Sequence, residues 1–190
     1  MNKKILRKKY FFYRNSFSKK EIQKMSYEIF FQLKKNFIWN KKYYHIFLPI
    51  RKYNEVETFI IINFLLKKKK YITIPYSNFK QLYIYNCFFD EKTLLKKNKY
   101  GIFEPIYKRF IHPYFIDIMF IPLLIFDIKG YRIGYGKGFY DRFVLLCKKN
   151  VIKIGLSFFD PINNIGDIHK NDLSLDIGIT TNHIYLFNNF

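Results

Sequence analysis

"YHIFLPIRKYNEVETFIIINFLLKKKKYITIPY", residues 44–76, places a long apolar run between two short ones. YHIFLP (44–49) and YITIPY (71–76) have the length and the aromatic and β-branched content of buried strands. ETFIIINFLLKKKK (57–70) has the length of a helix. A strand–helix–strand order predicts two parallel strands joined by a crossover helix.

The rest of the chain continues this alternation. Further strands are expected at 81–86, 117–126, 151–158 and 176–181, and a helix at Phe139–Lys149. Ahead of them, Lys3–Tyr13 reads as a basic helix. Ser18 and Glu21 form a capping box before a second helix, whose apolar positions are Ile22, Met25, Ile29 and Leu33. We therefore expect an α/β fold, a single domain over residues 1–190 with an N-terminal helical pair and a largely parallel sheet covered by helices on both faces.

Composition indicates a reduced, cytoplasmic protein. The chain has 190 residues, of which 49% are hydrophobic, enough for one full core. Cys87 and Cys147 cannot build a disulfide framework. The charged N-terminus has no signal-peptide apolar region, and the most apolar stretch, 114–128, is too short for a membrane helix and contains two aspartates. No membrane partner is expected, and a monomer is expected.

The net charge of +20 has two explanations. A polyanion-binding face, for RNA, is one. The other is mutational bias, because the chain has no alanine, is rich in Lys, Ile, Asn, Phe and Tyr, and uses far more lysine than arginine. Nucleic-acid readers favour arginine for its bidentate fork. We favour the bias and do not expect nucleic acid as a partner.

GYRIGYGKGFYDRF, residues 130–143, holds four of the eight glycines within nine residues. In a parallel sheet, ligands bind beyond the carboxyl ends of strands, where this loop is expected to meet the stretches after Leu48 and Pro75. The loop matches neither a P-loop nor a GxGxxG dinucleotide fingerprint.

Its chemistry nevertheless suits a phosphate. Gly134, Gly136 and Gly138 permit positive φ and a close backbone approach. Arg132 and Lys137 add positive charge, and the following helix begins with unpaired N–H groups. The loop is predicted to cradle a phosphate.

Three aspartates are candidates for a metal site. Asp141, in the first turn of the helix, either favours the helix dipole or binds Mg²⁺ beside the phosphates. A second carboxylate would come from Asp172 or Asp176. We favour Asp172, because Asp176 begins a strand.

The basic N-terminus has two interpretations as well. Lys3, Lys4 and Arg7 lie within about one helical turn and could reach one polyphosphate together. By themselves, they would form an ordinary solvated face.

These residues resemble the 5-formyltetrahydrofolate cyclo-ligase family. The resemblance runs nearly from end to end. It includes KKILR (3–7), FLPI…NEVET (47–58), GIFEP (101–105), FDIKGYRIGYGKGFYDRF (126–143) and NDLSLD (171–176), of which 126–143 is the most specific.

The resemblance implies a domain that binds ATP, Mg²⁺ and a reduced folate. The family converts 5-formyltetrahydrofolate to 5,10-methenyltetrahydrofolate while ATP becomes ADP and phosphate. The formyl oxygen attacks the γ-phosphate to give an iminophosphate, N10 closes the ring, and phosphate leaves.

The resemblance also implies roles by position. Lys137, Arg132 and Tyr140 would be catalytic, with Lys137 stabilising the transferred phosphoryl group, and Asp141 and Asp172 would hold Mg²⁺. ATP would contact Lys3, Lys4, Arg7, Arg132, Ile133, Gly134, Tyr135, Gly136, Lys137, Gly138, Phe139 and Tyr140. Folate would contact Leu48, Glu55, Tyr135 and Phe139, with Glu55 accepting hydrogen bonds from the pterin or orienting the formyl group.

The chain departs from the family pattern at three places. Phe139 stands where many relatives have tyrosine, Asn171 stands where bacterial relatives often have histidine, and the 49–54 loop is longer than in some members. Two other functions are alternatives: a non-enzymatic RNA-binding protein, and a sugar-phosphate or acyl-transfer enzyme, for which the sequence offers no convincing nucleophile.

Overall fold

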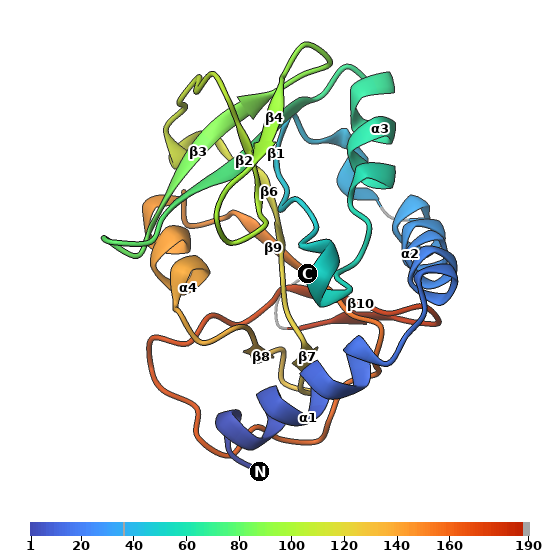
Figure 1. The fold of residues 1–190 in the computed structure, drawn as a ribbon. Coiled ribbons are helices and arrows are strands. Elements are labelled where there is room, and N and C mark those ends of the chain that lie inside the picture. Colours follow the sequence, from blue (N-terminus) through green and yellow to red (C-terminus); the bar gives the residue numbers. More distant parts are fainter. Residues whose placement is uncertain (36, 188–190) are drawn as a thin grey trace.

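A seven-stranded sheet forms the centre of the computed structural model, which describes residues 1–35 and 37–187 (Figure 1). Its strands are β1 (Tyr43–His45), β2 (Tyr71–Asn78), β3 (Tyr83–Phe89), β6 (Ile118–Ile121), β9 (Ile152–Leu156), β10 (Ile177–Ile179) and β11 (Ile184–Leu186). In space they follow the order β11-β10-β9-β6-β1-β2-β3. The inner pairings are parallel and the two edge strands are antiparallel to their neighbours, so the largely parallel sheet is confirmed.

Residues 44–76 form the expected crossover unit. β1 and β2 pair in parallel, with Tyr44 opposite Ile72, and α3 (Phe59–Lys67) connects them. The first strand is shorter than predicted. The Ile46 amide still donates to the Thr73 carbonyl at 2.9 Å, but the chain then leaves the ladder while residues 46–48 remain buried.

Helices cover both faces of the sheet. α2 (Lys19–Lys34) and α3 lie on one side in Figure 1, and α4 (Phe139–Phe143) lies on the other. The capping box that begins α2 is formed: the Ser18 amide donates to the Glu21 carboxylate at 2.8 Å, and the Glu21 amide donates to the Ser18 hydroxyl at 3.3 Å.

α1 (Lys3–Asn15) packs elsewhere, against the short hairpin of β7 (Ile125–Phe126) and β8 (Arg132–Ile133). Leu6 is its most buried side chain. With residues from the hairpin and its surroundings it forms a second apolar cluster: Leu6, Leu124, Ile125, Ile133 and Ile165.

Several boundaries differ from the sequence predictions. The helix expected at 139–149 ends at Phe143 and continues only as a 3-10 turn, Val144–Leu146, because the chain must turn at Lys148 to enter β9; Lys148 there pairs with Asp117. The strand expected at 117–126 stops at Ile121 because Pro122 has no N–H to donate.

The strand expected at 81–86 instead extends to Phe89, because it pairs with β2 from Asn78 back to Ile72. A hairpin of β4 (Leu95–Lys97) and β5 (Phe103–Pro105), and the edge strand β11, were not predicted. None of the helices in 1–35 and 37–187 combines the length and apolar content needed to cross a bilayer.

Candidate active site

A cavity of about 1210 Å³ lies where chain segments leave the carboxyl ends of β1 and β6. Phe47 and Leu48 follow β1, Pro122 follows β6, and the glycine loop (residues 130–138) forms another wall. This is the edge of a parallel sheet at which ligands generally bind.

Most residues predicted for the site line this one cavity. They are Lys3, Lys4, Arg7, Leu48, Glu55, Arg132, Gly134, Tyr135, Gly136, Lys137, Gly138, Phe139, Tyr140, Asp141 and Asp172. Ile133 is not among them, because its side chain is 1% exposed and packs in the cluster under α1. Asp176 is not among them either, because its carboxylate binds Lys153, 2.8 Å from Nζ.

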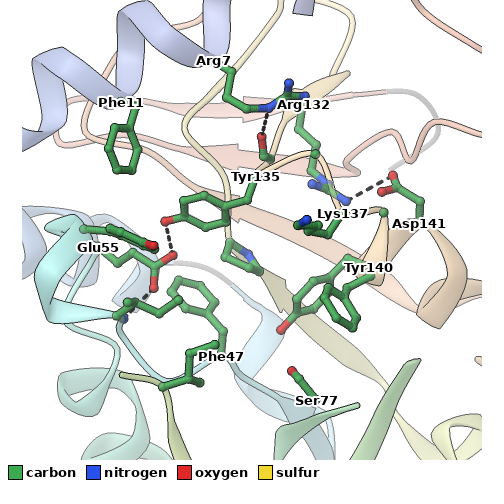
Figure 2. A pocket seen from close by; sticks show the side chains of 18 of the residues that line it. Arg7, Phe11, Phe47, Glu55, Ser77, Arg132, Tyr135, Lys137, Tyr140 and Asp141 are labelled. Carbon is green, nitrogen blue, oxygen red and sulfur yellow. Dashed lines mark hydrogen bonds and ion pairs between the residues drawn. The ribbon is translucent and has the colours of Figure 1, made fainter. Parts of the chain in front are cut away.

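Arginines support the glycine loop from two sides. Arg7 Nε donates to the Gly134 carbonyl at 2.9 Å, and Arg132 pairs with Asp141 at 3.1 Å. Burial lowers the pKa of Arg132, the Asp141 charge opposes this, and the guanidinium stays protonated. Figure 2 shows Arg7, Arg132 and Lys137 around the same part of the cavity. This part is suited to an anion.

The glycines have two different functions in the loop. Gly136 and Gly138 have φ of 84° and 64°, as predicted. Gly134 does not adopt the positive φ that a glycine permits. A Cβ at Gly134 would lie 2.5 Å from a guanidinium nitrogen of Arg132, so this glycine leaves space for that side chain.

Two carboxylates lie at the basic end. Asp141 Oδ1 accepts from Arg132 and, at 3.1 Å, from the Leu173 amide, which brings the 172–173 segment beside α4. Asp172 Oδ2 accepts from Lys3 and, at 2.6 Å, from the His169 amide. Burial would raise the pKa of Asp172, but the His169 amide and Lys3 outweigh it and lower the pKa.

Asp141 and Asp172 could hold Mg²⁺ only if water and phosphate oxygens supplied the other ligands. The described residues contain no group of three or more His, Cys, Asp or Glu side chains that could hold a metal. Asp141 and Asp172 each keep one oxygen to which no described residue donates. Mg²⁺ often takes one or two carboxylates and completes its shell with water and phosphate oxygens.

A hydrogen-bonded carboxylate lies at the other end of the cavity. Glu55, 3% exposed, accepts from the Tyr135 hydroxyl and, at 2.7 Å, from the Ile50 amide (Figure 2). Burial raises the pKa of Glu55, and Arg14, Tyr135 and the Ile50 amide oppose the rise. Arg14 donates a hydrogen bond to the Tyr135 hydroxyl, and it was not predicted from the sequence as a site residue. Its spacing of seven from Arg7, which puts both on one helix face, is the signal that could have identified it.

Tyr140 is held from behind by buried polar groups. Its hydroxyl lies 3.3 Å from His45 Nε2, and His45 Nδ1 lies 2.8 Å from Asn86 Oδ1. Burial lowers the pKa of His45 to about 4, so the ring is neutral. Burial and the Glu55 charge raise the pKa of Tyr140, so its phenol is neutral as well.

Aromatic rings form much of the remaining wall. The ring centroid of Tyr53 lies 5.6 Å from that of Tyr135. The ring centroid of Phe79 lies 5.3 Å from that of Phe139 and 4.1 Å from that of Tyr100. Besides Tyr135 and Phe139 these rings were not predicted individually, although the stretch after Pro75 was expected at this edge. Aromatic walls suit a flat heterocycle.

The fold and this cavity define an α/β protein with a candidate small-molecule site that is basic at one end and aromatic at the other. The model of the 5-formyltetrahydrofolate cyclo-ligase family matches residues 1–179. The chain belongs to this family.

Individual relatives agree with this assignment. The chain is 28% identical to a 5-formyltetrahydrofolate cyclo-ligase of Mus musculus over 72% of each chain, and 34% identical to one of Haemophilus influenzae over 55% of this chain and 58% of that one. With the cyclo-ligase of Mycoplasma genitalium it shares 50% identity, over only 25% of this chain and 29% of the relative.

Two solved structures share the fold. A 5,10-methenyltetrahydrofolate synthetase of Aquifex aeolicus superposes with a TM-score of 0.84 at 26% identity, covering 100% of this chain and 95% of that one. A 5,10-methenyltetrahydrofolate synthetase of Mycoplasma pneumoniae superposes with a TM-score of 0.75 at 25% identity, covering 95% and 99%. Neither the family nor these relatives support the alternative of a non-enzymatic RNA-binding protein.

Proposed function

We propose that this protein catalyses the ATP-dependent cyclisation of 5-formyltetrahydrofolate to 5,10-methenyltetrahydrofolate, with release of ADP and phosphate. The single observation that carries the proposal is the cavity: it brings a basic end and an aromatic, carboxylate-bearing end into one continuous space. Its volume of about 1210 Å³ exceeds that of a typical single-ligand pocket, which supports a site for two substrates.

The nucleotide belongs at the basic end. Lys3, Lys4 and Arg7 on α1 face the glycine loop across this part of the cavity and supply positive charge to a triphosphate. Arg132 and Lys137 flank the position of the γ-phosphate. Asp141 and Asp172 would hold Mg²⁺, which neutralises charge on the phosphate oxygens when it is bound.

The folate belongs at the aromatic end. Leu48, Tyr135 and Phe139 form walls against which the pterin packs. Glu55 accepts hydrogen bonds from pterin N–H groups, because it lines the cavity, each of its oxygens is fixed by one donor, and a carboxylate oxygen can accept more than one hydrogen bond.

The reaction proceeds by activation of an amide oxygen. The formyl oxygen attacks the γ-phosphorus, the bond to the β-phosphate oxygen breaks, and ADP leaves with that electron pair. N10 then attacks the formyl carbon, loses its proton, and the C–O bond breaks with release of phosphate, which leaves the cationic methenyl product. Lys137 and Arg132 stabilise the charge on the transferred phosphoryl group, and the cavity walls align the oxygen with it.

The proposal is tested by spectrophotometry. Purified protein is mixed with 5-formyltetrahydrofolate and magnesium, with and without ATP, at neutral or higher pH, where acid-driven cyclisation is slow. We expect an ATP-dependent rise of the near-ultraviolet methenyltetrahydrofolate band. A folded protein that binds ATP but produces no rise would contradict the proposed substrate, and one that does not bind ATP would contradict the nucleotide site as well.

A further inference from the structure

Arg14 is a buried cation beside the cavity, and the mechanism above does not use it. It lies near the end of α1, is 3% exposed and does not line the cavity. Nη1 donates to the Leu123 carbonyl at 2.9 Å, and Nη2 donates to the Tyr135 hydroxyl. Its Nε is buried without a partner among the described residues. An incompletely paired buried cation opposes folding, so stability alone does not explain its presence.

The hydrogen bonds from Arg14 have a fixed direction. A guanidinium can only donate, so the Tyr135 oxygen must accept from Arg14. Tyr135 has one proton, and it goes to Glu55 Oε1. The Glu55 carboxylate therefore accepts one hydrogen bond from the Tyr135 hydroxyl and one from the Ile50 amide, one on each oxygen. Hydrogen bonds of this kind stabilise the ionised form of a carboxylate.

We propose that Arg14 is a positioning residue that acts through Tyr135 to keep Glu55 ionised and aligned as the hydrogen-bond acceptor for the substrate heterocycle. This inference rests on the proposed function for the identity of the substrate. The part that concerns Glu55 itself stands on the geometry of Arg14, Tyr135 and Glu55.

Arg14 supplies the positive charge that opposes the effect of burial on Glu55, and the other titratable groups that interact with this carboxylate are two phenols. Arg14 lies on α1, and the phenols are Tyr135 in the glycine loop and Tyr140 on α4. Burial and the Glu55 charge raise the pKa of both phenols, so neither ionises near neutral pH. Because burial raises the pKa of Glu55, removing Arg14 would raise it further.

The first test needs no substrate. Protein carrying ¹³C-labelled glutamate side chains is titrated by NMR, and Glu55→Gln assigns the Glu55 signal. We expect Arg14→Gln and Tyr135→Phe to raise the Glu55 midpoint by about one unit or more, and Arg14→Lys to raise it less. Arg109→Gln, which removes an exposed arginine paired with Asp90, is the matched control and should leave the midpoint unchanged.

The second test measures the dissociation constant of 5-formyltetrahydrofolate between pH 5.5 and 8.5, without nucleotide. Below the shifted midpoint, Arg14→Gln should bind about tenfold or more weakly, and binding should recover at higher pH. Arg14→Lys should restore much of the affinity at neutral pH. A role in stability alone would lower affinity equally at every pH.

The two proposals fail separately. An unchanged Glu55 midpoint in Arg14→Gln overturns the role of Arg14, whether or not folate binds. A shifted midpoint in a protein that does not bind folate supports that role and contradicts the proposed substrate. If Arg14→Gln does not fold, Tyr135→Phe keeps the ring and removes the same bond, so an unchanged midpoint in that variant overturns the inference.

Discussion

Around the glycine loop, arginine and lysine side chains are placed differently. Arg7 and Arg132 are held by the Gly134 carbonyl and by Asp141, so they stabilise the loop as well as charge it. Lys137 is exposed and forms no ion pair with the described residues. A lysine ammonium on a flexible stem can therefore follow a phosphoryl group as it is transferred.

Replacement of Lys137 should separate catalysis from stability. We expect Lys137→Ala to lower kcat by about 10²- to 10³-fold, because in the proposed mechanism this charge acts mainly in the transition state. Its free energy of unfolding should change by no more than about 0.5 kcal/mol, since the side chain is exposed. Turnover and thermal unfolding are measured together, with Lys149→Ala, another exposed lysine, as control. Wild-type turnover in Lys137→Ala would contradict this role.

Gly136 should be needed for nucleotide binding as well as for stability. Its φ is 84°, and an added Cβ would lie 2.9 Å from the guanidinium carbon of Arg7. We expect Gly136→Ala to destabilise the fold by about 1–2 kcal/mol and to weaken ATP binding, because Arg7 is displaced from the loop.

The matched control for this substitution is Gly101→Ala. Gly101 has φ of 79°, but its Cβ would only touch the Lys52 side chain at 3.7 Å. Both variants are compared by calorimetric titration with ATP and by chemical unfolding. Equal ATP affinities for the two would show that the contact with Arg7 is not used.

At the scale of elements, α1 is both a covering helix and a wall of the site. Lys3, Arg7 and Arg14 are four and seven residues apart, which places them on one face. They reach Asp172, the Gly134 carbonyl and the Tyr135 hydroxyl. Leu6 anchors the helix in its own apolar cluster. The position of α1 therefore decides where three cations lie.

Loosening α1 should impair the site more than loosening another helix does. We expect Leu6→Ala to lower the free energy of unfolding by about 2–5 kcal/mol and to weaken ATP binding. Leu33→Ala is the matched control, because Leu33 is equally buried but lies on α2, away from the cavity. It should lose similar stability without a change in ATP affinity, measured below both unfolding transitions. If Leu6→Ala and Leu33→Ala lost the same ATP affinity, the loss would be due to reduced stability and not to the position of α1.

The elements that could be predicted are those whose signal is local. Residues 44–76 combine strand and helix signals in one short stretch, and Ser18 and Glu21 mark the start of α2. The end of α4, by contrast, depends on where Lys148 meets Asp117, which lies 31 residues earlier. A local apolar pattern does not contain that constraint.

The site could be predicted to a similar extent. The glycine loop has a strong composition signal, so its residues were identified. Arg14 and His45 act through partners that are distant in the sequence, so only the three-dimensional structure brings them to Tyr135 and Tyr140. The close approach of the Arg132 side chain to Gly134 could not be predicted either, because it depends on how that side chain is oriented in the folded protein.

At the scale of the whole molecule, one buried histidine links the fold to pH. His45 is fully buried behind the cavity, and burial lowers its pKa from 6.5 to about 4. Between these two values the unfolded chain binds a proton that the folded protein does not. Stability must therefore rise with pH across this window and fall as the pH drops from about 6.5 towards 4.

We expect the free energy of unfolding to lose about 3 kcal/mol through His45 over this window, since each pKa unit corresponds to about 1.4 kcal/mol. Asp117 and Asp172 also contribute to acid sensitivity. Burial would raise the pKa of each, but hydrogen bonds and lysine partners lower it, so their contribution to stability disappears only below the ordinary aspartate range.

Urea unfolding at pH 4.5, 5.5 and 7 measures this pH dependence. The free energy of unfolding should depend steeply on pH in the wild type and less steeply in His45→Gln, because glutamine cannot take up a proton. His112→Gln, which removes an exposed histidine, should keep the wild-type slope. A wild-type slope that His45→Gln retains would mean that other groups cause the acid sensitivity.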